Sequence, residues 1–147
     1  MEQILLEYSN RFKHFYRQQL EPLATQYGLT QPEVDILLFL HNHPQCRTAR
    51  EIVDIRGLSK SNVSTAVEKL RQKGWLTVSP DPANRRSHLL TLCPARQEEM
   101  AALAACQEAC MAVPVAGFTA EEMAFLRALW QRMDANIRRA WPPNKED

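Results

Sequence analysis

Short polar side chains gather in the middle of the chain, with lysines beside them. Ser61, Ser64 and Thr65 carry hydroxyl groups that can meet phosphates or base edges. Lys60 and Lys69 carry charges that suit phosphates. A helix that enters the major groove of DNA needs short side chains there, because bulk would hold its backbone away from the bases. These residues therefore favour nucleic-acid binding, and the alternative is an ordinary solvated helix.

Two adjacent arginines, Arg85 and Arg86, follow in the turn "PDPANRR". An arginine at the tip of a hairpin can enter a narrow, electronegative minor groove next to the one that the helix occupies. The candidate DNA-binding residues from the helix and the turn are Ser59, Lys60, Ser61, Asn62, Ser64, Thr65, Lys69, Arg85, Arg86 and His88.

The charges are unevenly distributed along the chain. Residues 1–46 carry three basic and five acidic side chains, residues 47–90 nine basic and four acidic, and residues 91–147 six basic and eight acidic. The net charges are −2, +5 and −2, within a total of +1. A basic middle third is an expected footprint of a nucleic-acid contact, although a solvated basic face gives the same pattern.

The cysteines and histidines are the other residues whose chemistry needs an explanation. Cys106 and Cys110 are four residues apart on an expected helix, where their Cβ atoms lie about 5–6 Å apart. A disulfide needs about 3.5–4.5 Å between Cβ atoms, so an intrahelical bond is disfavoured and ordinary burial is favoured over redox activity. His41, His43 and Cys46 lack the remaining ligands of a metal site, and no metal is predicted.

Catalysis finds little support in the sequence. It contains no glycine-rich phosphate loop, no His-Glu metal motif and no Gly-x-Ser-x-Gly elbow, so neither an enzyme nor a cofactor is predicted. The longest apolar run, "ILLFL", is far shorter than the roughly 20 residues that span a membrane. With no secretory signal and four scattered cysteines, we expect a cytoplasmic protein with reduced thiols. Disorder is expected only in the last residues, "PPNKED".

The elements around the polar helix have the order of a winged helix-turn-helix. Thr30 with Glu33 and Thr48 with Glu51 are capping patterns that begin two helices. Gly57 makes the turn into the next helix, whose expected core residues at helical spacing are Val63, Ala66, Val67 and Leu70. Two strand-like segments, "WLTVS" and "SHLLTLC", then flank the basic turn as a small β-hairpin.

Long helices are expected at both ends of the chain. Apolar residues recur at helical spacing over residues 1–28, with Pro22 as a point where this helix kinks or breaks. Thr119 with Glu122 caps a second series, whose apolar seam is Met123, Leu126, Trp130, Met133, Ile137 and Ala140. Two long terminal helices exceed what one small central domain can cover, so dimerisation is favoured over packing within a monomer.

The segments "LTQPEVDILLFL", "LSKSNVSTAVEKLRQKGWL" and "DPANRRSHLLTL" resemble the MarR family of winged-helix transcriptional regulators. The resemblance covers roughly residues 30–95 by motif and the whole length by helix order. It implies a mainly α-helical fold with a small β-hairpin wing and a single domain over residues 1–147. Residues 30–93 would form the DNA-binding lobe, and residues 1–28 and 95–141 the dimerisation helices.

The resemblance also implies a function. It points to a homodimeric regulator, in many relatives a repressor, that places one recognition helix per subunit on a pseudo-palindromic stretch of double-stranded DNA. Repression in such proteins is often relieved by a small aromatic ligand or by oxidation. Three positions depart from the family pattern: Asn84 replaces an aspartate in the wing, Thr65 a long basic residue, and Cys93-Pro94 a capping threonine.

In proteins that resemble this one, small ligands occupy a crevice between the dimerisation helices and the DNA-binding lobe. Aromatic walls with few polar groups suit an aromatic acid or a phenol, and Arg17 could pair with a carboxylate. The candidate ligand-binding residues are Phe12, His14, Phe15, Tyr16 and Arg17, with packing in the dimer as the alternative role. Two other functions stay open: a thiol-based redox-responsive regulator, and a winged-helix protein-interaction module that does not bind DNA.

Overall fold

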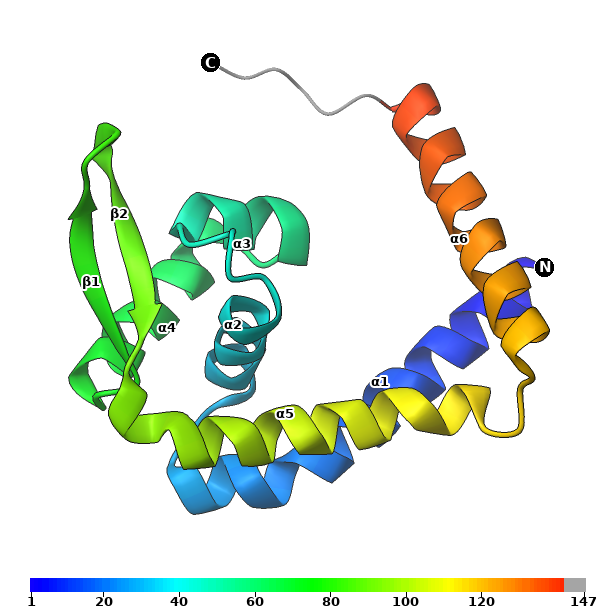
Figure 1. Cartoon of the computed structure of the whole chain (residues 1–147), viewed down its shortest axis with the longest axis horizontal. Helices are drawn as coiled ribbons and strands as arrows, with labels where there is room; N and C mark the ends of the chain where they lie inside the picture. The colour runs from blue at the N-terminus through cyan, green and yellow to red at the C-terminus, as the bar shows by residue number, and fades with distance from the viewer. Residues whose placement is uncertain (142–147) are drawn as a thin grey trace. The chain divides into compact units, whose positions relative to one another are not determined.

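The structure, a computed structural model, describes residues 1–141. The terminal segment "PPNKED", for which disorder was expected, lies outside the described residues. The described residues form helices joined by short loops and one two-stranded hairpin (Figure 1). The elements are α1 Glu2–Tyr27, α2 Gln31–Asn42, α3 Ala49–Arg56, α4 Lys60–Gln72, β1 Leu76–Asp81, β2 Asn84–Leu92, α5 Gln97–Ala112 and α6 Ala120–Ala140. Short 3-10 turns, Pro94–Arg96 and Val113–Val115, precede and follow α5.

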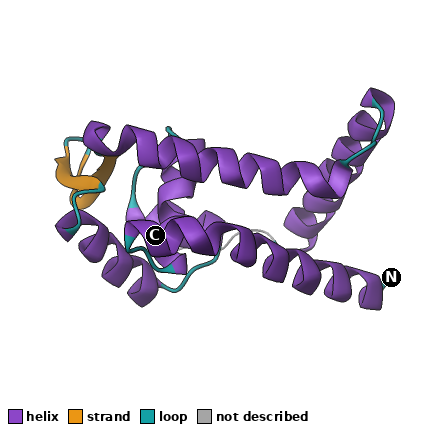
Figure 2. Cartoon of the chain, turned by 90° about the horizontal axis from the view of Figure 1, so that it is seen from below, coloured by secondary structure: helices purple, strands orange, loops and turns teal. Residues whose placement is uncertain are grey.

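The mainly α-helical winged helix-turn-helix fold predicted from the sequence is confirmed. Among residues 1–141, strands are confined to the hairpin, as Figure 2 shows by colour. The chain divides into two compact units, Met1–Cys110 and Met111–Asp147, and the second is described as far as residue 141.

Local capping explains where the helices begin. The main-chain N–H groups of Thr30, Thr48 and Thr119 each donate to the glutamate three residues later, at 3.0, 2.9 and 2.8 Å. These are the capping patterns read from the sequence, and they satisfy N–H groups that a helix start leaves without partners. Gly28 ends α1 with φ 65°, a left-handed conformation that glycine adopts without steric cost. Pro22, expected to kink or break this helix, lies inside α1 and does not end it, so there is no break.

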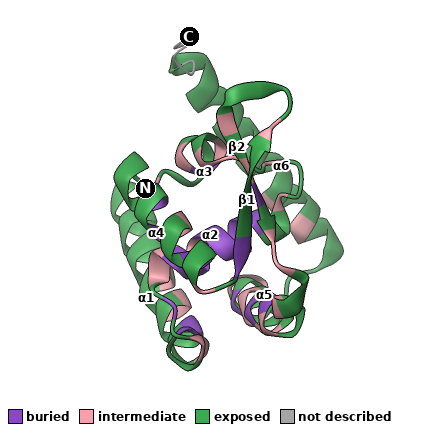
Figure 3. Ribbon diagram, turned by 90° about the vertical axis from the view of Figure 1, so that its left-hand side faces the viewer, coloured by how far each residue is buried: buried purple, intermediate pink, exposed green. Residues whose placement is uncertain are grey.

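The core is centred on α2, which is buried along most of its length (Figure 3). α4 packs on it through Val63, Ala66 and Leu70, which confirms most of the expected core face. Val67 is only half-buried and packs at the edge of this core. The remaining buried side chains come from all the neighbouring elements and include Leu20, Ile52, Trp75, Leu76, Leu90, Met100 and Leu103.

The hairpin is longer than predicted, and its loop is shorter. Leu76 pairs with Leu92 at its base, and the antiparallel pairing continues through Pro80 opposite His88 to Asp81 opposite Asn84. Arg86 and Arg85, expected in the loop, therefore lie within β2. The register shifts between Pro80 and Asp81, and such an irregularity accommodates a proline that has no N–H for the ladder. The alternation of side chains could not reveal this, because both strands are exposed there.

Helices on the C-terminal side differ in how they begin. Cys93 precedes the Pro94–Arg96 turn without a side-chain hydrogen bond, in agreement with the loss of a hydroxyl cap noted in the sequence. α6 in the second unit begins at the Thr119 cap.

Among residues 1–141, no single helix is long and apolar enough to cross a membrane. One consecutive pair, Pro94–Val115 with Ala120–Ala140, meets the criteria of length and composition only when the two helices are taken together.

Candidate nucleic-acid interface

The polar face of α4 is exposed on the side opposite its buried residues. The side chains of Lys60, Ser61, Asn62, Ser64, Thr65 and Lys69 are all exposed, as is the capping residue Ser59. The Ser59 hydroxyl accepts a hydrogen bond from the Asn62 N–H at 3.2 Å and lies 3.4 Å from the Ser61 hydroxyl. The candidate residues of the helix are thus brought together on one face, and packing of the other face on α2 holds it outward.

The wing presents its arginines and His88 to solvent. Arg85, Arg86 and His88 are exposed on β2. The turn before them is fixed by two short polar side chains: Asp81 Oδ1 accepts from Ala83 N–H at 2.9 Å, and Asn84 Oδ1 from Arg86 N–H at 3.1 Å. The Asn84 amide therefore holds the main chain at the wing tip by a hydrogen bond that needs no charge.

Arg47, in the loop between α2 and α3, anchors the hairpin to the helices. Its carbonyl oxygen accepts from Leu90 N–H at 2.7 Å, and its guanidinium Nη2 donates to Thr91 Oγ1 at 2.7 Å. Sequence reasoning missed this residue. Its only sequence signal is a basic residue directly before a helix cap, which is too common to identify an anchor.

Glu68 places a carboxylate on the exposed face of α4, among the candidate residues. Arg71 donates to it through Nε at 2.9 Å and Nη2 at 2.7 Å, and Gln72 donates at 2.9 Å. These hydrogen bonds, chiefly those from Arg71, lower the pKa of Glu68 from 4.5 to about 2. The expected DNA-binding set omitted all three residues, although the spacing of three and four residues on a helix predicts such a cluster.

The candidate ligand-binding residues of α1 separate into two groups. Phe12 has its ring centroid 6.3 Å from that of Phe15 and 6.0 Å from that of Tyr16, and all three are half-buried. His14 and Arg17, by contrast, are exposed. The structure therefore groups the aromatic residues but leaves His14 and Arg17 at the surface.

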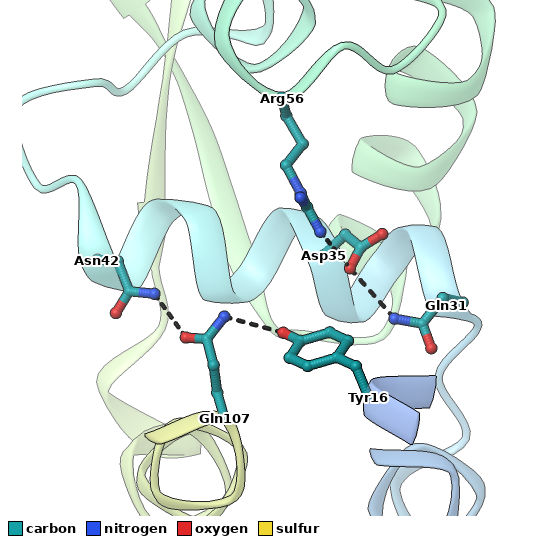
Figure 4. Close-up of polar contacts among 6 residues, drawn as sticks. All are labelled: Tyr16, Gln31, Asp35, Asn42, Arg56 and Gln107. Carbon is teal, nitrogen blue, oxygen red and sulfur yellow. Dashed lines mark hydrogen bonds and ion pairs between the residues drawn. The ribbon is translucent and has the colours of Figure 1, made fainter. Parts of the chain in front are cut away.

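A chain of polar contacts links α1, α2 and α5 beside this aromatic group (Figure 4). Gln107 on α5 donates to the Tyr16 hydroxyl at 2.9 Å and accepts from the Asn42 side chain at 2.6 Å. Burial raises the pKa of Tyr16 above 10.0, so it stays a neutral phenol at physiological pH. Further along α2, Arg56 pairs with Asp35 at 2.9 Å.

Cys106, Cys110 and His43 make packing and hydrogen-bonding contacts within the fold. Cys110 is buried, and burial together with the neighbouring Cys106 raises the pKa of its thiol above 9.0. Cys106 donates to the Gln19 carbonyl at 3.4 Å. All four cysteines are free. His43 stacks on Phe39 with ring centroids 4.5 Å apart, and no group of three or more metal-ligating side chains occurs within residues 1–141.

A helix-turn-helix with an exposed polar second helix, followed by a basic hairpin, defines a winged helix-turn-helix protein. Residues 27–87 match the family model described as MarR family. The search of curated proteins found no match.

Solved structures extend the likeness over nearly the whole chain. The transcriptional regulator PA3341 is 21% identical, with a TM-score of 0.80 over 94% of this chain and 98% of that chain. A MarR family regulator from Listeria monocytogenes, solved in complex with a 26mer DNA, is 19% identical, with a TM-score of 0.77 over 100% and 97%. BpsR from Bordetella bronchiseptica, whose DNA binding is regulated by 6-hydroxynicotinic acid, is 20% identical, with a TM-score of 0.68 over 91% and 92%. The resemblance to the MarR family is confirmed, and the chain has the fold of a MarR-family transcriptional regulator.

Proposed function

We propose that this protein is a homodimeric repressor that binds a pseudo-palindromic operator in double-stranded DNA, rather than an enzyme. The observation that carries the proposal is the division of α4 into two faces. Val63, Ala66 and Leu70 fix the helix to the core, and short polar residues such as Ser61 and Thr65 face outward. In this role the side chains of α4 enter the major groove, and Arg85 and Arg86 reach the adjacent minor groove.

The DNA-binding proposal is tested by gel retardation with random duplex DNA at low salt, followed by selection of preferred sequences. Thr65→Glu should abolish retardation, because it places a carboxylate against phosphates without disturbing the core. Thr25→Glu is the matched control, since Thr25 is exposed on α1, away from α4 in the sequence and outside the basic segment. Wild-type protein that retards no duplex, or a Thr65→Glu variant that binds normally, would refute the proposal.

The proposed dimer uses the terminal helices, residues 1–28 and 95–141. Support comes from apolar side chains that each unit leaves exposed. On α6 the exposed fractions are 55% for Trp130, 43% for Met133 and 61% for Ile137. On α1, Ile4 is 71% exposed. Apolar exposure along two helices is typical of surfaces that a partner covers.

An aromatic effector that releases the DNA is the finer part of the proposal. The half-buried rings of Phe12, Phe15 and Tyr16 and the polar groups beside them support it, as does the regulation of BpsR by an aromatic acid. A ligand that binds only the DNA-free arrangement lowers affinity for the operator reciprocally. Titration of the protein–DNA complex with salicylate-like acids tests this, and release that is lost in Arg17→Ala would support it.

Peroxide is the parallel treatment in the same titration. Release by peroxide alone, abolished by cysteine-to-serine changes, would replace the aromatic effector with thiol sensing. The raised pKa of Cys110 argues against that alternative, because the thiolate is the reactive form.

A further inference from the structure

Lys73, the residue directly after α4, joins the ends of three helices. Its ammonium Nζ donates to the carbonyl oxygen of Gly28, at the end of α1, at 2.7 Å. The same Nζ lies 2.7 Å from Oε2 of Glu33, in the first turn of α2. The end of the candidate recognition helix is therefore tied to α1 and α2 through one side chain.

Glu33 is distinguished by its burial. Its exposed fraction is 0%, whereas the glutamates of the other two capping boxes, Glu51 and Glu122, are half-buried and exposed. Capping alone therefore does not require a buried carboxylate, which is costly unless it is paired. Lys73 supplies the pairing charge. Oε2 of Glu33 is shared between Lys73 and the Thr30 N–H, and Oε1 has no hydrogen-bond partner within the described residues.

The main chain of Lys73 extends this junction to the start of α5. Arg96 donates from Nη2 to the Lys73 carbonyl oxygen at 3.3 Å and pairs with Glu99 at 2.9 Å. The Arg96 guanidinium also lies 5.2 Å from the ring centroid of Trp75, whose ring is 5.8 Å from that of Tyr27 on α1. Four helix ends thus meet at one residue: the end of α1, the start of α2, the end of α4 and the start of α5.

We propose that Lys73 and Glu33 are positioning residues for DNA binding, which fix the direction of α4 relative to α1 and α5. This inference rests on the proposed function. If α1 and α5 belong to the dimer, the separation of the two copies of α4 depends on how firmly each is held to those helices. The pair would then determine how strictly the protein selects the spacing between the two half-sites.

The experiment compares duplexes that carry two half-sites at the selected spacing, two half-sites with one base pair inserted, or a single half-site. The variant Glu33→Gln with Lys73→Met removes both charges together, leaves no unpaired buried charge, and keeps an amide oxygen for the Thr30 N–H. The matched control is Arg50→Met with Asp54→Asn, which removes an exposed ion pair of α3, 3.8 Å long, outside the terminal helices and outside the candidate DNA-binding residues. Thermal melting and sedimentation check that both variants fold and dimerise.

In the wild-type protein, one inserted base pair should weaken binding by about tenfold or more, because it shifts one half-site by about 3.4 Å and rotates it. In the double variant this penalty should fall to about threefold or less, with affinity for the single half-site unchanged within about twofold. Lys73→Arg alone, which keeps a cation opposite Glu33, should retain most of the wild-type penalty. The control should behave as the wild type does.

An unchanged insertion penalty in the folded double variant would overturn the inference, and so would a parallel loss of half-site and operator affinity, which indicates a role in the fold alone. If the double variant does not fold, Glu33→Gln alone takes its place, with a reduced penalty expected and an unchanged one contradicting the inference. Failure of the wild-type protein to bind any duplex would instead refute the proposed function itself.

Discussion

Glu68 is a carboxylate on a face of α4 that we propose meets phosphates. Its hydrogen bonds to Arg71 and Gln72 favour the ionised form and hold its pKa at about 2. Because the folded-state pKa is lower than the ordinary value of 4.5, any stability from this cluster is present above pH 4.5 and is lost as the pH falls towards 2. The charge of Glu68 therefore does not change across the physiological range.

Arg71→Ala should return the pKa of Glu68 towards its ordinary value of 4.5, because the guanidinium is the largest cause of the shift. NMR titration of the Glu68 carboxyl carbon measures this directly. Lys69→Ala is the control, since Lys69 is also an exposed cation of α4, whereas the hydrogen bonds to Glu68 come from Arg71 and Gln72. A pKa that stays near 2 in Arg71→Ala would contradict the assignment.

Arg85 and Arg86 of the wing provide a second test at the level of single residues. Arg85→Ala with Arg86→Ala should weaken operator binding and reduce the slope of log affinity against log salt by about 1 per lost phosphate contact. Arg11→Ala, at an exposed position on α1, should leave both quantities unchanged. Equal affinity and slope in a folded double variant would show that the wing does not contact DNA.

At the scale of elements, local signals predicted the helices well and the hairpin less well. Three capping boxes and the glycines after α1 and α3 determine where helices begin and end through contacts within a few residues, so the sequence contains the information. The wing loop was predicted too long because Arg85 and Arg86 are exposed on paired strands, where no burial pattern marks the pairing. The junction at Lys73 was not predictable, since its partner Glu33 is 40 residues away.

Within α4, Leu70 and Val67 should differ in their contribution to stability. Leu70 is fully buried against α2, so Leu70→Ala should lower the free energy of unfolding by about 2–5 kcal/mol. Val67 is half-buried, and Val67→Ala should cost about 1 kcal/mol, because its surroundings can relax towards solvent. Urea denaturation compares the two variants. Equal losses would mean that Val67 is packed as tightly as Leu70 rather than lying at the edge of the core.

Across the whole molecule, the boundaries of the basic segment do not coincide with those of the two compact units. The basic segment, residues 47–90, falls entirely within the unit Met1–Cys110, together with every candidate DNA-binding residue. The unit Met111–Asp147 contributes α6, on which Phe125 and Leu129 are exposed in addition to the seam residues Trp130, Met133 and Ile137. The sequence predicts the seam from its helical spacing, and the proposed dimer would cover it.

Ending the chain after Gly117 removes α6 and tests its role in the proposed dimer. The product should be monomeric or poorly soluble and should bind the operator much more weakly, because each half-site alone binds feebly. Sedimentation velocity and gel retardation measure the two effects. A control with α6 present but Arg132→Ala should dimerise normally. A truncated protein that remains dimeric and binds DNA as before would exclude α6 from the interface.

The anchoring of the hairpin by Arg47 has a consequence for kinetics. Arg47 forms hydrogen bonds with β2 through both its carbonyl oxygen and its guanidinium, and it directly precedes the cap of α3. The wing therefore has little freedom to swing independently of the helices. Under the proposed function, neither groove can be released while the other is still held in its final geometry. Dissociation would then require the contacts of α4 and of the wing to break in one step. The release of the protein from a single operator should therefore follow one exponential.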